Sequence, residues 1–178
     1  MAHKDDSAVV RSSVWIMPSG GALDRIEKII NRVHPRGGGP RFRPHLTLLA
    51  GSETTQADAE RKLKHLAAGL RPFEIRLGRV EWRSEYFRCL YLAAELSPEL
   101  AAAQRAAYEA FEMNPPPFEP HVSLLYGNID EALKKELAVE ASGSLDLAFV
   151  ATGVQLVNAS QSVPVTGWKT LAERAFAT

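Results

Sequence analysis

Two nine-residue segments of the chain repeat one order of residue types. Residues 43–51 read RPHLTLLAG and residues 119–127 read EPHVSLLYG. Each contains Pro, His, an aliphatic residue, a hydroxyl residue, Leu-Leu, one variable residue and Gly, in that order. Each segment therefore offers an imidazole, which can move protons, and a hydroxyl, which can donate a hydrogen bond. The four side chains singled out in this way are His45, Thr47, His121 and Ser123.

These groups would face one ligand if both segments are strands. Side chains on a strand alternate between its two faces, so each His points the same way as the hydroxyl two residues later. The hydroxyls can donate to phosphoryl oxygens. One neutral imidazole can take a proton from water, while the other, protonated, can give one to the departing oxygen. The pattern predicts hydrolysis of a phosphodiester, and a strained five-membered cyclic phosphate could be opened without a metal.

The competing interpretation is a duplication that was retained only for packing. A lone His-x-Thr or His-x-Ser on a strand is more often structural than catalytic. Packing explains the shared Leu-Leu, but it does not explain a His and a hydroxyl on one face in both copies. We therefore interpret the repeat as a site with His45 and His121 as its catalytic pair.

The overall composition favours a small substrate. The chain has 178 residues, 46% of them hydrophobic, and its 21 Lys and Arg equal its 21 Asp and Glu. A protein that grips long nucleic acid usually carries a basic surplus. Long nucleic acid is therefore an unexpected partner, although RNA ends remain open. We take a monomer as the default, since the sequence does not indicate an oligomeric state.

The sequence contains no motif that indicates a cofactor, a metal site or a membrane-spanning segment. Cys89 is the only cysteine, and no His-x-His or Asp-rich cluster suggests a metal centre, so we expect neither metal nor cofactor. No apolar run approaches the roughly 18 residues that span a bilayer. The charged start MAHKDDSAVVRSS lacks the apolar segment of a signal peptide, so we expect a cytoplasmic protein without a membrane partner.

Hydrophobic periodicity and turn residues predict alternating strands and helices. We expect two similar α+β lobes, each offering one repeat strand, within a single domain over residues 1–178. Strands are predicted near residues 8–17, 46–50, 73–82, 87–96, 121–125, 144–150, 152–158 and 163–171, and helices near 22–33, 55–69, 98–113 and 130–139.

Longer stretches around the repeat carry a resemblance to a known family. The chain resembles the two-histidine (2H) phosphoesterase superfamily, which has two His-x-Thr/Ser elements, and within it the plant and fungal type of cyclic nucleotide phosphodiesterase. These stretches occur in the family's order and cover nearly the whole chain. They are SVWIMP, GPRFRPHLTL, FRCLYL, PHVSLLYG and GWKTLA.

The resemblance implies a fold and an activity. The implied fold is α+β, bilobal and pseudo-symmetric, with two antiparallel sheets lining a central cleft and helices outside. The implied activity is metal-independent hydrolysis of 2′,3′-cyclic nucleotides, to 2′-phosphates, and of ADP-ribose 1″,2″-cyclic phosphate. By the same resemblance His45, His121, Thr47 and Ser123 carry over as catalytic and phosphate-binding residues, Tyr126 contacts the phosphate or base, and Trp15 helps to wall the site.

Further candidates each have an alternative explanation. Arg41 and Arg43 share the face of His45 if its strand extends backwards, and could meet a second phosphate; they could equally be solvated. Trp168 could close a wall of the cleft or belong to the core. Tyr126 would face away on a regular strand, so its contact with a ligand requires the strand to bend or end near Leu125.

Two other functions stay open. One is an RNA 2′,3′-cyclic phosphodiesterase or 2′–5′ RNA ligase-like enzyme. The sequence SLLYG lacks the arginine that such relatives often carry after the second motif, which disfavours this branch. The other is a nucleotide-binding protein of the same fold without turnover, and the two intact His–hydroxyl pairs argue against it.

Overall fold

A computed structural model describes residues 8–143, 146–159 and 163–178. The charged start of the chain (1–7) and the beginning of the strand predicted at 144–150 lie outside these residues. The described elements are β1 (Val9–Ile16), α1 (Gly20–Gly37), β2 (Leu46–Thr55), α2 (Gln56–Gly69), β3 (Phe73–Glu81), the 3₁₀ turn η1 (Tyr86–Arg88), β4 (Leu90–Ala94), α3 (Pro98–Ala110), β5 (His121–Leu125), α4 (Glu131–Ala141), β6 (Leu147–Ala151), β7 (Gly153–Val157), η2 (Val165–Gly167) and β8 (Thr170–Ala175).

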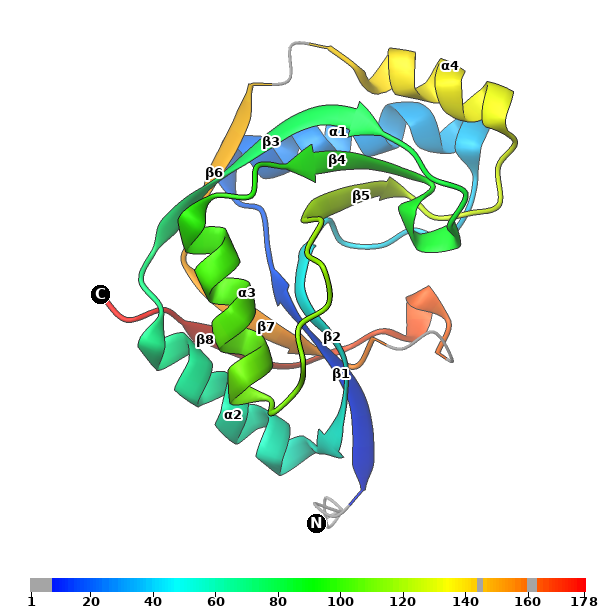
Figure 1. The fold of residues 1–178 in the computed structure, drawn as a ribbon. Helices are drawn as coiled ribbons and strands as arrows, with labels where there is room; N and C mark the ends of the chain where they lie inside the picture. The colour runs from blue at the N-terminus through cyan, green and yellow to red at the C-terminus, as the bar shows by residue number, and fades with distance from the viewer. Residues whose placement is uncertain (1–7, 144–145, 160–162) are drawn as a thin grey trace.

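The strands form an antiparallel sheet that curls around the molecule (Figure 1). Its order is β6-β3-β4-β5-β2-β1-β7-β8, so two four-stranded halves meet where β5 lies beside β2. Within the described residues, one paired position joins the halves, Leu46 with Val122. The expected bilobal α+β fold is confirmed, with the two expected sheets joined into one through this pair.

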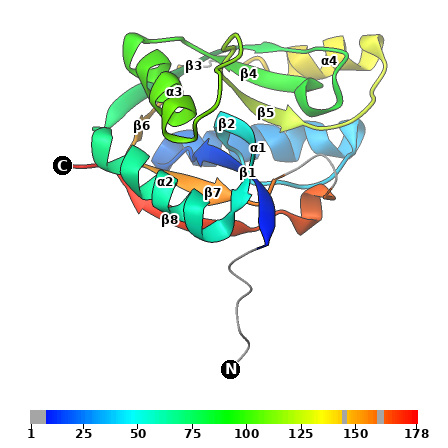
Figure 2. The same cartoon turned by 60° about the horizontal axis from the view of Figure 1, so that its bottom comes forward.

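Helices cover the two halves in pairs. α1 packs against β5 and β6 and also against α4, whereas α2 packs against β7 and β8 and also against α3. Figure 2 shows α2 running beside β7 and β8. α1 directly follows β1 in the chain but covers the half that does not contain β1. The two halves are therefore interlocked by the path of the chain.

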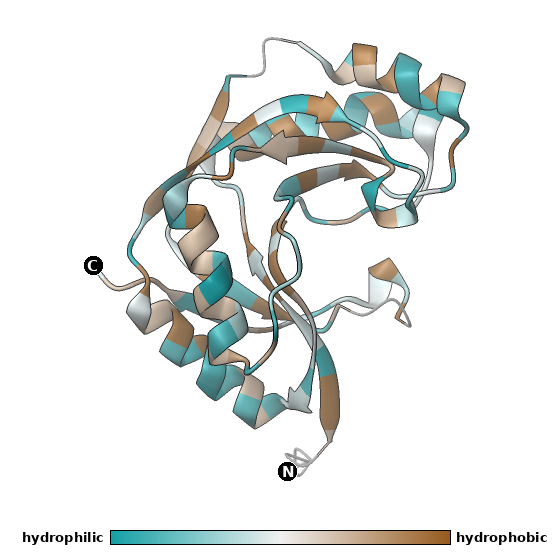
Figure 3. Cartoon of the chain, in the orientation of Figure 1, coloured by the Kyte–Doolittle hydropathy of each residue, from teal (hydrophilic) through white to brown (hydrophobic). Residues whose placement is uncertain are grey.

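Local sequence explains where three of the helices begin. The side chains of Thr55, Ser97 and Asp130 each accept a hydrogen bond from the backbone N–H three residues later, which satisfies a donor that the first helical turn leaves free. Figure 3 shows hydrophilic and hydrophobic residues mixed along α2, as an amphipathic helix requires. No helix among the described residues is long and apolar enough to cross a membrane.

Some predicted boundaries differ from the structure. The first repeat strand does not leave the sheet at Gly51 but continues to Thr55. The pairing of β1 with β2 shifts register between the Ser12–Ser52 pair and the Val14–Leu49 pair, because β2 has a bulge there. Gly51 lies within this bulge and adopts φ +76°. The last strand begins only at Thr170, because the turn η2 occupies the start of its predicted range.

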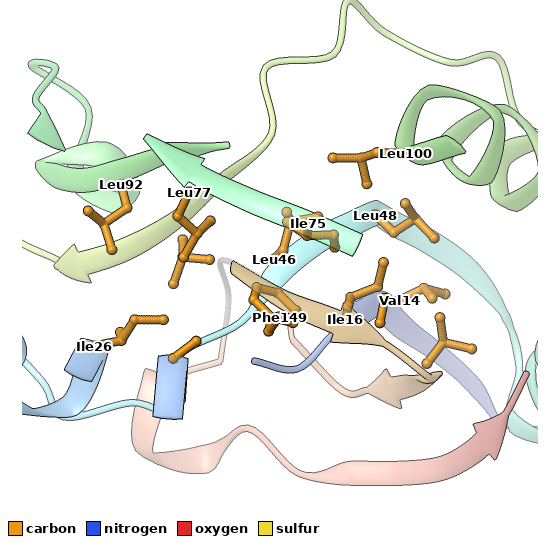
Figure 4. Packing of buried hydrophobic residues seen from close by; sticks show 14 of the residues in the cluster. Val14, Ile16, Ile26, Leu46, Leu48, Ile75, Leu77, Leu92, Leu100 and Phe149 are labelled. Carbon is orange, nitrogen blue, oxygen red and sulfur yellow. The ribbon is translucent and has the colours of Figure 1, made fainter. Parts of the chain in front are cut away.

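Each repeat strand has one face buried in the core and the opposite face directed towards the candidate site. Leu46, Leu48, Val122 and Leu124 are at most 1% exposed. Figure 4 shows Leu46 and Leu48 packed among side chains from other elements of both halves. Because side chains alternate along a strand, burying these residues directs the intervening Thr47 to the other face, the face of the site.

Candidate active site

The pairing of β2 with β5 brings the two motifs together. Leu46 and Val122, the middle residues of the His-x-Thr and His-x-Ser elements, are the paired residues. In an antiparallel pair, the residue before one partner lies towards the residue after the other. His45 therefore lies towards Ser123. By the same relation Thr47 lies towards the second histidine.

Both imidazoles are oriented in the same manner. His45 Nδ1 lies 2.6 Å from the carbonyl oxygen of Arg43, and His121 Nδ1 lies 2.9 Å from that of Glu119. A carbonyl oxygen only accepts hydrogen bonds, so each Nδ1 carries the hydrogen. In the neutral form, each Nε2 is then unprotonated and able to accept a proton.

Four aromatic side chains surround His45; we call Trp15, Phe42, Tyr126 and Trp168 the aromatic group. Trp15 stacks on the imidazole with ring centroids 3.5 Å apart and planes 8° apart. The hydroxyl of Tyr126 lies 3.4 Å from Nε2. Burial lowers the pKa of His45 to about 4, with a smaller contribution in the same direction from the nearby charge of His121. His45 is therefore neutral at pH 7.

His121 has more polar surroundings. Its ring packs edge-on against Tyr91, with centroids 5.2 Å apart, and the residue is half-buried. Burial is the largest cause that lowers the pKa of His121, and the Arg88 guanidinium acts in the same direction, while Glu119 opposes it. The two histidines thus occupy unlike environments despite the repeated sequence.

The hydroxyl residues occupy matching positions. Thr47 pairs across the sheet with Trp15, and Ser123 pairs with Tyr91. In each half, the aromatic residue opposite the hydroxyl also packs against the histidine. Ser123 is buried, and its Oγ donates a hydrogen bond to the Phe87 carbonyl at 3.0 Å.

Tyr126 reaches the site because β5 ends at Leu125, as its predicted contact required. Burial raises the pKa of its hydroxyl, so Tyr126 stays protonated and can donate a hydrogen bond. Phe42 stacks on its ring with centroids 3.8 Å apart. The preceding loop passes so close that a Cβ on Gly39, where φ is +82°, would collide with the Tyr126 carbonyl oxygen. The Gly-rich loop thus positions both aromatic rings.

We expect Gly39→Ala to reduce both stability and activity. The positive φ costs an Ala about 1–2 kcal/mol, and displacing Tyr126 adds about 1–3 kcal/mol. Gly38→Ala is the matched control, because Gly38 also has a positive φ, +67°, but open space around its Cβ. Urea unfolding and initial rates measure the two effects. Equal losses in both variants would show that the contact with Tyr126 does not matter.

Of the remaining predicted residues, Trp168 lies at the site, whereas Arg41 and Arg43 are exposed. The ring of Trp168, just after η2, lies 6.3 Å from that of His45 and so lines the site. The strand does not extend backwards to Arg41 and Arg43, because β2 begins at Leu46, so the condition for their sharing the face of His45 is not met. Arg41 is exposed and donates to Asn31 Oδ1 of α1 at 2.6 Å. Arg43 is exposed but close enough to His45 for its charge to lower that pKa.

Several residues at the site were not singled out from the sequence. All of them fall within the stretches GPRFRPHLTL and FRCLYL, which carried the resemblance to the family. Their individual roles depend on contacts between distant segments, which the stretches alone do not specify. These residues are Phe42, Phe87, Arg88 and Tyr91.

Over the described part of the chain, no group of three or more His, Cys, Asp or Glu side chains is placed to hold a metal ion. Cys89 is buried, and burial raises the pKa of its thiol. A protonated, buried thiol is a poor nucleophile, so Cys89 is not a candidate catalytic group.

Comparison with known proteins identifies the family. The model of the 2′-5′ RNA ligase superfamily matches residues 18–162. The chain belongs to this family of two-histidine phosphoesterases and is an enzyme of the phosphodiesterase class. The resemblance inferred from the repeated motifs is thereby confirmed.

Individual relatives agree with this assignment. The chain is 28% identical over 166 residues to the cyclic phosphodiesterase of Arabidopsis thaliana, covering 90% of this chain and 92% of that protein. Its fold is similar to E. coli LigT complexed with 3′-AMP, with a TM-score of 0.67, 17% identity and coverage of 96% of this chain and 100% of LigT. The protein TT0787 of Thermus thermophilus gives a TM-score of 0.63 at 21% identity, covering 93% of this chain and 97% of that one.

Proposed function

We propose that the protein hydrolyses small 2′,3′-cyclic nucleotides, to 2′-phosphates, and ADP-ribose 1″,2″-cyclic phosphate, by acid–base catalysis without a metal. The observation that carries this proposal is the Leu46–Val122 pairing. It supports a site in which two imidazoles, each with Nδ1 held by a carbonyl and Nε2 left as the reactive atom, lie on one side of the sheet together with two hydroxyls. The cyclic phosphate lies between the histidines.

The reaction exchanges one phosphorus–oxygen bond for another. One neutral imidazole takes a proton from water at Nε2 as the water oxygen bonds to phosphorus. The bond from phosphorus to one ribose oxygen breaks, and the other histidine, as an imidazolium, gives that oxygen a proton. Exchange with solvent then returns both histidines to their starting states. Release of ring strain in the five-membered phosphate supplies part of the driving force.

Hydroxyl donors hold the phosphoryl group. Thr47 and Ser123 donate to the non-bridging oxygens, once the Ser123 hydroxyl turns from the Phe87 carbonyl, and Tyr126 adds a third donor. Charge that develops on these oxygens is stabilised most where water is excluded. The aromatic group provides this exclusion on the side of His45, with Trp15 and Trp168 as walls.

The relatives support a nucleotide as substrate. The Arabidopsis relative is named a cyclic phosphodiesterase, and LigT has been crystallised with 3′-AMP, ATP and NADP⁺. Arg43 lies at the rim near His45 and would meet a second phosphate of an ADP-ribose substrate. Arg41 could join it only after release from Asn31.

A second candidate is hydrolysis or joining of RNA ends. The family description, 2′-5′ RNA ligase superfamily, favours it. The balanced charge of the chain and the absence of an arginine after the second motif favour the small substrate. Comparing kcat/KM for 2′,3′-cyclic AMP and for a short RNA ending in a cyclic phosphate would separate the two. A nucleotide-binding protein without turnover would bind both and convert neither.

Phosphorus NMR tests the proposed reaction directly. We expect 2′,3′-cyclic AMP incubated with the protein and EDTA to give a 2′-phosphate resonance, absent with a His45→Ala/His121→Ala variant. A 3′-phosphate would retain the chemistry but reverse the regiochemistry. Loss of activity on chelation, restored by a divalent metal, would contradict the metal-free reaction.

A further inference from the structure

The turn η1 contacts the second repeated segment along its length. It lies just before β4 in the chain. Its three residues, in chain order, contact the end, the middle and the start of the segment 119–127, whose strand β5 is labelled in Figure 1. The first two contacts use backbone carbonyls of the turn, and the third uses a charged side chain. The contacts are Tyr86 O with Gly127 N at 3.0 Å, Phe87 O with Ser123 Oγ at 3.0 Å, and Arg88 Nη2 with Glu119 Oε2 at 2.7 Å.

The third contact restrains a carboxylate that would otherwise move freely. The side chain of Glu119 is 56% exposed, whereas that of Arg88 is 19% exposed. Arg83 Nη2 holds the second carboxylate oxygen at 3.2 Å. Arg88 itself lies over the ring of Tyr91, 5.3 Å from its centroid. An ion pair anchored in this way holds a fixed geometry better than two flexible surface chains.

The restrained residue also orients the second histidine. The carbonyl of Glu119 accepts the Nδ1 hydrogen of His121 and so leaves Nε2 as the working atom. We propose that Arg88 is a positioning residue for His121, acting through Glu119. Only the kinetic test of this positioning role rests on the proposed function.

The first motif lacks this arrangement. The Arg43 carbonyl plays the part of the Glu119 carbonyl, but no salt bridge of the Arg43 side chain is found among the described residues. The ring of His45 is held by stacking on Trp15. Among the residues that the structure describes, the ring of His121 has only an edge contact with Tyr91, so its orientation depends more on the backbone carbonyl.

The charges around His121 allow positioning to be separated from a direct electrostatic effect. Arg88 and Glu85 come from η1 and the turn before it, Glu119 from the segment itself, and His45 from the first motif. The charge of Arg88 lowers the pKa of His121, whereas that of Glu119 raises it. Removing either breaks the ion pair, but the two removals shift the pKa of His121 in opposite directions.

The test compares Arg88→Ala and Glu119→Gln. We expect kcat for 2′,3′-cyclic AMP to fall at least tenfold in both and KM to change less than threefold. The double variant should be no worse than Glu119→Gln, because the Arg88–Glu119 pair is already lost in either single variant. Arg88→Lys should restore part of the rate. Arg76→Ala, which breaks an exposed pair with Glu74 on β3, should leave kcat unchanged.

Nitrogen-15 NMR of the imidazoles gives a readout that does not need turnover. We expect a single Nδ1–H tautomer of His121 in the starting protein, a mixture in Arg88→Ala and Glu119→Gln, and an unchanged His45. An unchanged His121 tautomer with rates equal to those of Arg76→Ala would overturn the proposal, as would rates that move in opposite directions in the two variants. If the starting protein hydrolyses no cyclic phosphate, the proposed function fails and the tautomer still decides the positioning role.

Discussion

Replacing either His45 or His121 with Ala should lower kcat/KM for 2′,3′-cyclic AMP by about 10²–10⁴-fold, the range that a positioned acid or base contributes. Each imidazole is fixed through Nδ1 by the carbonyl two residues earlier, so each has one Nε2 for the reaction. Initial rates across a range of substrate concentrations measure the loss. The double variant should be far less impaired than the product of the single losses, since acid and base act in one step.

Matched controls separate catalysis from folding. His65→Ala removes an exposed imidazole on α2 and should leave the rate unchanged. Thr47→Ala and Ser123→Ala should lose less than the histidine variants, because each removes one of several donors to the phosphoryl group. A folded His45→Ala or His121→Ala protein with more than half of the starting rate would rule out the two-histidine reaction.

The free energy of unfolding should fall by roughly 3 kcal/mol as the pH is lowered from 6.5 to 4, on account of His45 alone. Burial lowers the pKa of His45 from 6.5 to about 4 in the folded protein. Between these values the unfolded chain binds more protons than the folded one, so stability is fully present above pH 6.5 and is lost on acidification. The lowered pKa of His121 acts in the same direction.

Urea unfolding at a series of pH values measures this dependence. Carboxylates such as Asp58, whose pKa falls to about 2, add their own dependence at lower pH. The free energy of unfolding of His45→Asn should therefore be compared with that of the starting protein at each pH. As the pH falls, the stability of His45→Asn should rise relative to that of the starting protein. His65→Asn should run parallel to the starting protein. Parallel curves for all three proteins would show that His45 is not buried in its neutral form.

The sequence was most informative where chemistry is local. The alternation of side chains along a strand predicted that each histidine shares a face with its hydroxyl residue, and the helix predicted near 98–113 does begin at Pro98. The doubt about Tyr126 also followed from alternation, and it was resolved by the end of β5 at Leu125. These features depend on neighbours within a few residues.

Features that depend on distant segments could not be predicted. Nothing local indicates that Leu46 pairs with Val122, or that Arg88 meets Glu119. The first repeat strand was predicted near residues 46–50, and its continuation past Gly51 through a bulge follows from the partner strand β1. The stacking of Phe42 on Tyr126 likewise joins two loops that the sequence does not connect.

The Leu46–Val122 pairing has a consequence for how the enzyme becomes active. Each half of the sheet carries one of the two motif histidines. The helix α1 follows β1 in the chain but packs against β5 and β6, in the half of the sheet that does not contain β1. Under the proposed two-histidine reaction, a chain in which only one half has formed would have one of the two catalytic imidazoles and would not turn over. On that proposal we expect activity to return during refolding only after β2 and β5 have paired, so that its recovery would report assembly of the whole molecule.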